Sequence, residues 1–139
     1  MGYLIDSSVW IAHERGSLDL SGLVQRRIAR NEDETFHLSV VTASELLHGV
    51  HRASTAAQRA RRSAFVEAIL DQTPLLPIDL PTARVHSELW AGLAEAGTHV
   101  GAHDLWIAAS AVAHGLTLAT LNRRHFDRVP GLDVADWST

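Results

Sequence analysis

The sequence predicts an α/β fold in which a parallel β-sheet carries helices on both faces. Short apolar runs alternate along the chain with longer stretches that repeat apolar residues at helical spacing. Strands separated by helices form βαβ units, and such units build parallel sheets that are covered on both sides. The length of 139 residues and the apolar content of 46% suit one domain, so we expect a single domain over residues 1–139.

The N-terminal half is expected to hold two strands and four helices. The strands are predicted at Gly2–Ile5 and Phe36–Val41, where apolar and β-branched residues cluster. The spacing of apolar residues predicts helices at Ser7–His13, Leu18–Arg30, Thr42–Arg52 and Thr55–Leu70. Each strand is thus followed by enough chain for a parallel crossover.

A weaker strand signal follows at Leu75–Ile78, where two prolines lie in or beside the run. Because proline cannot donate to a sheet, this strand is expected to be short or to lie at an edge. Pro81 suits the first turn of a helix that runs to about Ala96, since its missing N–H would be unpaired there anyway. Gly97 is placed to end that helix.

The C-terminal third contains one helix and two strands. His103–His114 is apolar on nearly all sides, which predicts a buried helix closed by Gly115. Leu116–Thr120 is a predicted buried strand, and Leu132–Ala135 is expected to pair at a sheet edge.

Three carboxylates, Asp6, Glu45 and Asp104, stand where an apolar run gives way to a helical pattern. The carboxyl ends of parallel strands meet at one edge of a sheet, and ligands bind in the crevice beyond it. Acids that reach this edge from separate segments can therefore converge on one site. Oxygen-only ligands suit Mg²⁺, with Mn²⁺ as a substitute, better than zinc. The implied reaction is hydrolysis of a phosphodiester.

Helix capping is the alternative role for the same acids. Asp6 is suited to an N-cap, and Thr42-Ala-Ser-Glu45 matches the capping-box pattern. However, Asp6 follows Tyr-Leu-Ile, and Asp104 begins one of the most apolar segments of the chain. A carboxylate in such surroundings is costly unless it is paired, hydrogen-bonded or bound to metal. From the residues alone, both roles stay open.

Composition excludes several other kinds of chemistry. The chain has no cysteine, which excludes disulfides, thiolate zinc sites and a cysteine nucleophile. All 12 basic residues are arginine, which excludes a P-loop lysine and Schiff-base catalysis. No apolar run reaches the length of a membrane span and no signal peptide is recognisable. We therefore expect a soluble, cytoplasmic protein that does not bind membranes.

The net charge of −4 argues against coating nucleic acid by bulk attraction. Arginines nevertheless form two local clusters, which consist of Arg52, Arg59, Arg61 and Arg62, and of Arg123, Arg124 and Arg128. Each cluster is either a solvated surface or a contact for a phosphate backbone.

Histidine and serine offer weaker alternatives for a site. His48 with His51, and His99 with His103, are spaced so that each pair can share a helix face, but no His-Glu-x-x-His motif supports zinc. None of the serines near the acids lies in a Gly-x-Ser-x-Gly elbow, so a serine nucleophile is disfavoured.

The tryptophans are expected to serve the fold more than recognition. Trp10, Trp90 and Trp106 fit apolar helix faces and are predicted to lie in the core. Trp137, close to the C-terminus, is expected to be exposed or to contact a second subunit.

Four segments occur along the chain in order: Leu-Ile-Asp6-Ser-Ser-Val-Trp-Ile, Thr-Ala-Ser-Glu45-Leu-Leu-His-Gly, Gly-Ala-His-Asp104-Leu-Trp-Ile-Ala-Ala, and the run from Leu116 to Leu132 that contains Thr120-Leu-Asn122-Arg-Arg-His. Together they resemble PIN-domain ribonucleases, and most closely the VapC toxins of bacterial toxin–antitoxin pairs. The resemblance covers nearly the whole chain. It implies one PIN-like domain that uses Mg²⁺ to cleave RNA, either tRNA or ribosomal RNA. It also implies a small VapB-like antitoxin that docks over the site, and a homodimer.

The resemblance also assigns roles to individual residues. The acids that match the family's catalytic, metal-holding positions are Asp6, Glu45 and Asp104. Ser8 matches a hydroxyl residue that supports the first acid, and Thr120 and Asn122 match the family's Thr-x-Asp/Asn signature, in which the second position is catalytic.

The fourth acidic position of the family pattern does not carry an acid in this chain. Asn122 stands where relatives often have aspartate, and His125 where some have another acid. This favours one firmly held Mg²⁺ over two. Arg123, Arg124 and His103 are candidates for RNA contact. Two alternatives remain, namely a degenerate PIN module that binds RNA or antitoxin without cutting, and a metal-dependent phosphohydrolase of small molecules.

Overall fold

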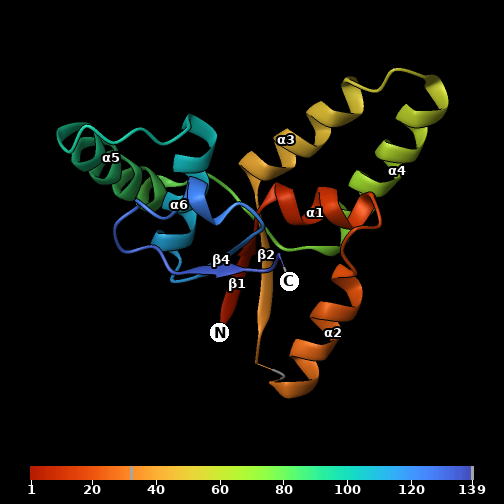
Figure 1. The fold of residues 1–139 in the computed structure, drawn as a ribbon, viewed down its shortest axis with the longest axis horizontal. Coiled ribbons are helices and arrows are strands. Elements are labelled where there is room, and N and C mark those ends of the chain that lie inside the picture. The colour runs from red at the N-terminus through yellow and green to blue at the C-terminus, as the bar shows by residue number, and fades with distance from the viewer. Residues whose placement is uncertain (32, 139) are drawn as a thin grey trace.

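A computed structural model describes residues 1–31 and 33–138 of the chain. The helices and strands follow one another as β1 (Gly2–Ile5), α1 (Ser7–Glu14), α2 (Leu20–Arg30), β2 (Thr35–Ser39), α3 (Val40–His51), α4 (Ala56–Gln72), β3 (Leu75–Leu76), α5 (Leu80–Glu95), α6 (Ala102–Ala113), β4 (Thr117–Thr120), the short 3₁₀ helix η1 (Arg123–His125) and β5 (Val134–Asp136). Figure 1 shows α5 and α6 on one side of the central sheet, and α1 to α4 on the other.

The strands form one five-stranded parallel sheet in the order β3-β2-β1-β4-β5. From β1 the chain winds outward through β2 to β3, and it then crosses to β4 and β5 on the opposite side of β1. The winding direction therefore reverses between β1 and β4. The crevice at the carboxyl ends of such a pair of strands is where open α/β sheets bind their ligands.

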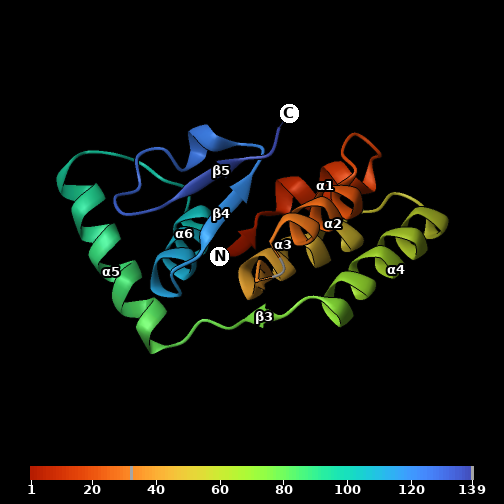
Figure 2. The same ribbon diagram turned by 90° about the horizontal axis from the view of Figure 1, so that it is seen from below.

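The two central strands alternate their side chains between two cores. Leu4 and Leu118 pack with Ile107 of α6 on one face of the sheet. Ile5 and Ala119, their neighbours in sequence, pack beneath α1 and α2 on the other face. Both faces are thus buried under helices, which confirms the predicted architecture and explains why these strands are continuously apolar (Figure 2).

The second strand is shorter than predicted. It ends at Ser39, because the Ser39 hydroxyl accepts a hydrogen bond from the Val41 N–H at 3.1 Å and so caps α3. The prediction of a strand through Val41 was wrong, since the cap and tertiary packing override the β propensity of valine. The predicted capping box was also wrong, because Thr42 is a fully buried residue inside α3 and Glu45 lies in the second turn of that helix.

The expected edge strands and helix ends are confirmed. β3 has two residues and β5 three, and both lie at the edges of the sheet. Gly97 and Gly115 have φ values of +69° and +65°, and each follows the last turn of a helix, α5 and α6 respectively. Glycine adopts this left-handed conformation without the steric cost that other residues incur.

Two tryptophan predictions were wrong. Trp90 is 63% exposed, and it belongs to α5, which Figure 2 shows at the outside of the fold. Trp137 is only 3% exposed, and the Arg27 guanidinium lies 4.8 Å from the centre of its ring. Trp10 and Trp106 are half-buried. In the part of the chain that is described, no helix is both long and apolar enough to cross a membrane.

Candidate active site

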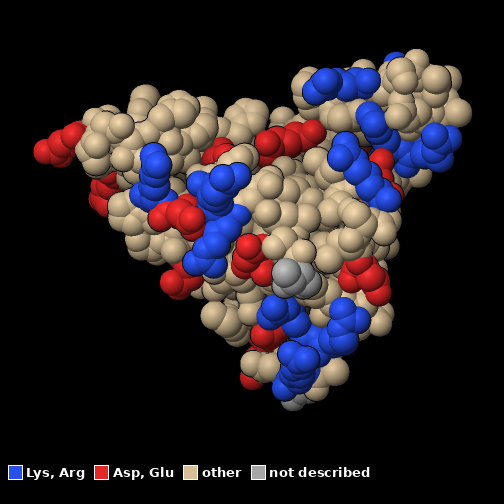
Figure 3. All heavy atoms as spheres, viewed as in Figure 1, with Lys and Arg blue, Asp and Glu red and all other residues tan. Residues whose placement is uncertain are grey.

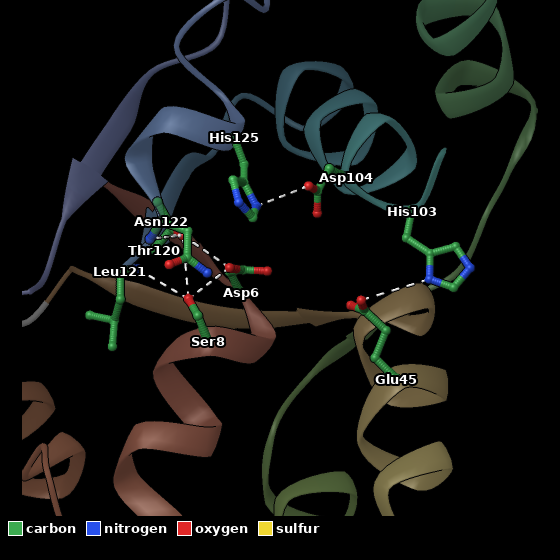
Figure 4. Close-up of polar contacts among 9 residues, drawn as sticks. All are labelled: Asp6, Ser8, Glu45, His103, Asp104, Thr120, Leu121, Asn122 and His125. Atoms are coloured by element: carbon green, nitrogen blue, oxygen red, sulfur yellow. Dashed lines mark hydrogen bonds and ion pairs between the residues drawn. The ribbon is translucent and has the colours of Figure 1, made fainter. Parts of the chain in front are cut away.

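Asp6 lies directly after β1, in the middle of the carboxyl edge of the sheet (Figure 4). Its side chain is buried, and Oδ2 accepts hydrogen bonds from the hydroxyls of Ser8 at 2.8 Å and Thr120 at 2.9 Å. The Ser8 hydroxyl in turn accepts the Leu121 N–H at 3.1 Å, which ties the start of α1 to the segment after β4. Asp6 is the N-cap residue of α1, but its side chain accepts no capping hydrogen bond. The carboxylate is therefore oriented by the two hydroxyls and points into the crevice.

Glu45 projects toward the same crevice from α3 (Figure 4). Its side chain is 28% exposed, and Oε2 lies 3.7 Å from Nδ1 of His103. Oε1 is buried and has no hydrogen-bond partner among the described residues. A buried carboxylate oxygen without a donor is costly, so Oε1 is available to a cation or a water molecule.

Asp104 reaches the crevice from the first turn of α6. Its side chain is 25% exposed, and Oδ2 lies 3.3 Å from Nδ1 of His125 (Figure 4). The N-cap of this helix, Gly101, has no side chain to satisfy the first N–H groups. Asp104 therefore lies where the helix dipole favours a negative charge.

The three acids influence one another electrostatically. Burial raises the pKa of the Glu45 carboxyl, and the negative charge of Asp6 raises it further. The pKa of Asp104 is raised for the same two reasons in the same order. The imidazoles of His103 and His125 act in the opposite direction. Crowded, partly buried carboxylates of this kind are stabilised by a bound divalent cation.

Replacing Glu45 with glutamine is expected to stabilise the metal-free protein at neutral pH. The folded-state pKa of Glu45 lies above its ordinary value of 4.5, so the wild type loses stability as the pH rises through the folded-state pKa. The gain from Glu45→Gln is therefore present at pH 7 and disappears as the pH falls below the ordinary value. We expect the unfolding temperature to rise by about 2–4 °C at pH 7, measured by circular dichroism in EDTA from pH 4 to 8.

The matched control for this prediction is Glu67→Gln, which removes the same charge from an exposed position on α4. It should change the unfolding temperature little, and equally at every pH. An equal gain in the two variants, or a gain from Glu45→Gln that grows toward pH 4, would contradict a buried, repelled carboxylate at position 45.

The chemistry of the site fits a divalent cation. Across residues 1–31 and 33–138, no three His, Asp or Glu side chains already stand in an arrangement that could hold a metal ion. The pairs His48 with His51 and His99 with His103 are therefore not part of such a group. The carboxylates of Glu45 and Asp104 are instead turned toward His103 and His125. All three acids nevertheless offer oxygen ligands, none is paired with a described arginine, and Glu45 Oε1 has no other partner. Hard cations prefer such oxygen donors.

The remaining predicted site residues are Asn122, which lies near the acids, and the two arginines that follow it. Asn122 lies beside the acids, two residues after the end of β4, and its N–H donates to the Thr120 hydroxyl at 2.9 Å (Figure 4). Arg123 donates instead to Asp127 at 3.2 Å, so its guanidinium is already engaged, whereas Arg124 is exposed. Sequence reasoning missed both contacts between a histidine and an acid, because each joins segments that only the fold brings together.

A groove of about 660 Å³ begins at Glu45 and runs between α1, α3 and α4. The arginines that line it are Arg15, Arg52, Arg61 and Arg62. Arg62 is held in place by a hydrogen bond to the carbonyl of Gly49 at 2.9 Å. Figure 3 shows acidic atoms between two groups of arginine side chains, one over α3 and α4 and the other over the segment between β4 and β5. Arginine side chains thus flank the acids on both sides.

Comparison with known proteins gives the same identification along the whole chain. The model of the PIN domain family matches residues 3–132. A protein named Ribonuclease VapC1 from Rickettsia felis is 32% identical over 134 residues, which cover 96% of this chain and 95% of that protein. A protein named tRNA(fMet)-specific endonuclease VapC from Salmonella typhimurium is 36% identical over 100 residues, which cover 72% of this chain and 74% of that protein.

A solved structure agrees with these sequence matches. The crystal structure of DNA-bound VapBC from Salmonella typhimurium contains a chain that superposes with a TM-score of 0.84 at 28% identity. The superposition covers 99% of this chain and 98% of that one. The sheet is parallel, three acids lie at its carboxyl edge, and the family model and the Rickettsia felis protein match nearly the whole chain. The chain therefore belongs to the PIN domain family and, within it, to the VapC ribonucleases.

Proposed function

We propose that the protein is a Mg²⁺-dependent endoribonuclease and the toxin of a toxin–antitoxin pair. The observation that carries this proposal is the convergence of Asp6, Glu45 and Asp104, from three separate elements, on one crevice where Glu45 Oε1 is buried without a partner. In this proposal the three acids hold the ion, for which Mn²⁺ is a substitute.

The chain's own residues have distinct parts in the proposed reaction. A bound Mg²⁺ would lower the pKa of a water molecule and neutralise charge on the phosphoryl oxygens. Glu45, whose Oε1 is buried without a hydrogen-bond partner among the described residues, is suited to bind the ion directly or through a water molecule and to help position the attacking water. Ser8 and Thr120 keep Asp6 in one orientation. The exposed side chain of Asn122 orients a water or a phosphate oxygen.

RNA is the proposed substrate class, as either tRNA or ribosomal RNA. The Salmonella typhimurium relative is named a tRNA(fMet)-specific endonuclease, and the three acids of this chain lie in a surface flanked by arginines. Arginine contacts to phosphates position a nucleic acid without reading its sequence. His103 and Arg124 lie next to the acids and are proposed to contact the RNA as well.

We further propose a VapB-like antitoxin as the protein partner, acting in the cytoplasm. The superposed Salmonella typhimurium chain comes from a VapBC complex. Three carboxylates without a paired arginine can accept a basic side chain as well as a cation. The antitoxin is therefore expected to cover the acids with such a side chain. A homodimer remains a prediction from the family resemblance.

The test is cleavage of RNA by protein freed of any partner. We expect Mg²⁺-dependent cleavage of total tRNA or ribosomal RNA that falls by at least about 100-fold in EDTA and returns with Mg²⁺ or Mn²⁺. Mg²⁺ at ten times its Kd should also stabilise the fold by about 1.4 kcal/mol in thermal unfolding.

Other outcomes of that test favour other functions. Stabilisation by Mg²⁺ and binding of RNA without cleavage would favour the inactive binding module. Turnover of p-nitrophenyl phosphate with no effect on RNA would favour a small-molecule phosphohydrolase. Cleavage that persists in EDTA would contradict the metal site.

A further inference from the structure

A second hollow lies beside Asp104, at the end of the site that Glu45 does not line. It measures about 350 Å³, which is within the range of small-ligand sites, roughly 300–1,000 Å³. Its walls are the segment that enters α6 and the segment around η1, and the side chains that matter are Asp104, His99, His125, Arg124 and Arg128. It is therefore continuous with the acids but built by different elements from those of the α3–α4 groove.

The charge of this hollow favours an anion. Arg124 and Arg128 are exposed and make no hydrogen bond or ion pair with the residues that the structure describes. Arg123, in the same run, is different because it pairs with Asp127 at 3.2 Å. Of the three arginines in this run, the two whose guanidinium groups have no described partner are thus the two that line the hollow. Asp104 is the one acid among the described residues that line the hollow, and its carboxylate faces His125.

The backbone adds to this preference. Val100 and Gly101 line the hollow where α6 begins, and the helix has no side-chain cap. The N–H groups of a first helical turn without a cap are donors for an anion. Together with two guanidinium groups, which bind phosphate oxygens in a bidentate manner, they make the hollow suited to a phosphate.

We propose that this hollow is a subsite for a backbone phosphate of the RNA strand, next to the phosphodiester held at the acids, and that Arg124 and Arg128 are its binding residues. The proposal rests on the nuclease function proposed above. Because Asp104 belongs to both sites, a strand whose scissile phosphate lies at the acids has an adjacent phosphate within reach of the hollow. The subsite would fix the register of the strand, so that Arg124 and Arg128 act on binding more than on the chemical step.

A binding experiment with chemically altered RNA tests this proposal. The probe is a fluorescently labelled synthetic fragment of tRNA(fMet), together with copies that each carry one uncharged methylphosphonate linkage. Binding is measured by fluorescence anisotropy in an Asp6→Asn background, so that no cleavage interferes. We expect Arg124→Gln/Arg128→Gln to raise Kd about tenfold and to reduce the slope of log K against log salt by about 0.7, which corresponds to one phosphate contact on a single strand.

The methylphosphonate copies locate the phosphate that the subsite holds. At one linkage beside the cleavage position, loss of the charge should weaken binding to the protein with intact arginines by about the same factor. The Arg124→Gln/Arg128→Gln variant should show no further loss at that linkage. A Kd that the arginine substitutions leave unchanged would overturn the proposal, and so would a methylphosphonate effect of equal size in both proteins. Either result would do so even if the hollow bound an acidic segment of a protein partner.

Kinetics and a control variant separate this role from a structural one. With Asp6 intact, Arg124→Gln/Arg128→Gln should raise KM about tenfold and leave kcat within about twofold, because the subsite binds the strand and not the reacting atoms. Arg30→Gln removes an exposed arginine at the end of α2, away from the acids, and should leave both constants unchanged (Figure 1). A failure of the nuclease function would appear differently, as a wild type that binds the probe but does not cut RNA with Mg²⁺.

Discussion

Asp6→Asn is expected to abolish RNA cleavage, with a fall in kcat/KM of at least about 1,000-fold, while the protein stays folded. Asp6 is the most buried of the three acids and the one that directly follows the central strand β1, between α3 with Glu45 and α6 with Asp104. An amide keeps an oxygen that can accept the hydroxyls of Ser8 and Thr120, so the packing survives. It lacks the negative charge on which a divalent cation and the electrostatics of the site depend. The measurement is the rate of RNA cleavage in Mg²⁺, with circular dichroism as the check on folding.

The control for this substitution is Asp71→Asn, at an exposed position near the end of α4. It removes the same charge from the chain and should leave the cleavage rate within about twofold. If Asp6→Asn cleaved RNA at the wild-type rate, the assignment of the acidic crevice as the active site would be wrong.

The parts of the fold and site that the sequence predicted are those with a local signal. Each central strand is a continuous apolar run because both faces of the sheet are buried, and such a run is visible in the sequence. Asp6 and Asp104 could be recognised because each stands next to such an apolar segment, where a charge is costly to bury unless it has a partner. Once the strands are parallel, the convergence of the acids follows from the topology and needs no further information.

The parts that the sequence did not predict depend on distant segments. The partners of Glu45 and Asp104 are histidines, and no spacing rule links Glu45 to His103 or Asp104 to His125. The hydroxyl of Thr120 reaches Asp6 only because β4 pairs with β1. In each case the contact is set by how elements pack, which single-sequence patterns do not encode.

The predictions of which tryptophans are buried were wrong for the same reason. Trp90 and Trp137 both lie in segments whose local pattern does not say which neighbour will cover them. The first is on the outer helix and is left exposed, whereas the second is enclosed by the ring of Tyr3 and the guanidinium of Arg27. A helical or extended pattern gives the orientation of a side chain relative to its own element, but not the depth of that element in the fold.

Phe126→Ala is expected to lower the free energy of unfolding by about 3–5 kcal/mol, a large part of the roughly 5–15 kcal/mol that holds a domain folded. Phe126 is 1% exposed, and it packs with Leu4, Ile107 and Leu118 in the core between the sheet and α6. Its removal leaves a cavity that close-packed strands and α6 cannot fill. Urea denaturation at pH 7 in EDTA measures the change, and a loss below about 1 kcal/mol would contradict the central packing of this ring.

Trp90→Ala is the matched control, because it also removes an aromatic ring, but from a position that is 63% exposed. It should cost less than about 1 kcal/mol. Phe126 immediately follows η1, which carries Arg124 and His125, so its burial also anchors the wall of the proposed phosphate subsite to the core. Phe126→Ala should therefore weaken RNA binding at a temperature where the variant is still folded, whereas Trp90→Ala should not. A Phe126→Ala protein that loses stability but binds RNA as tightly as the wild type would show that the wall keeps its position without this anchor.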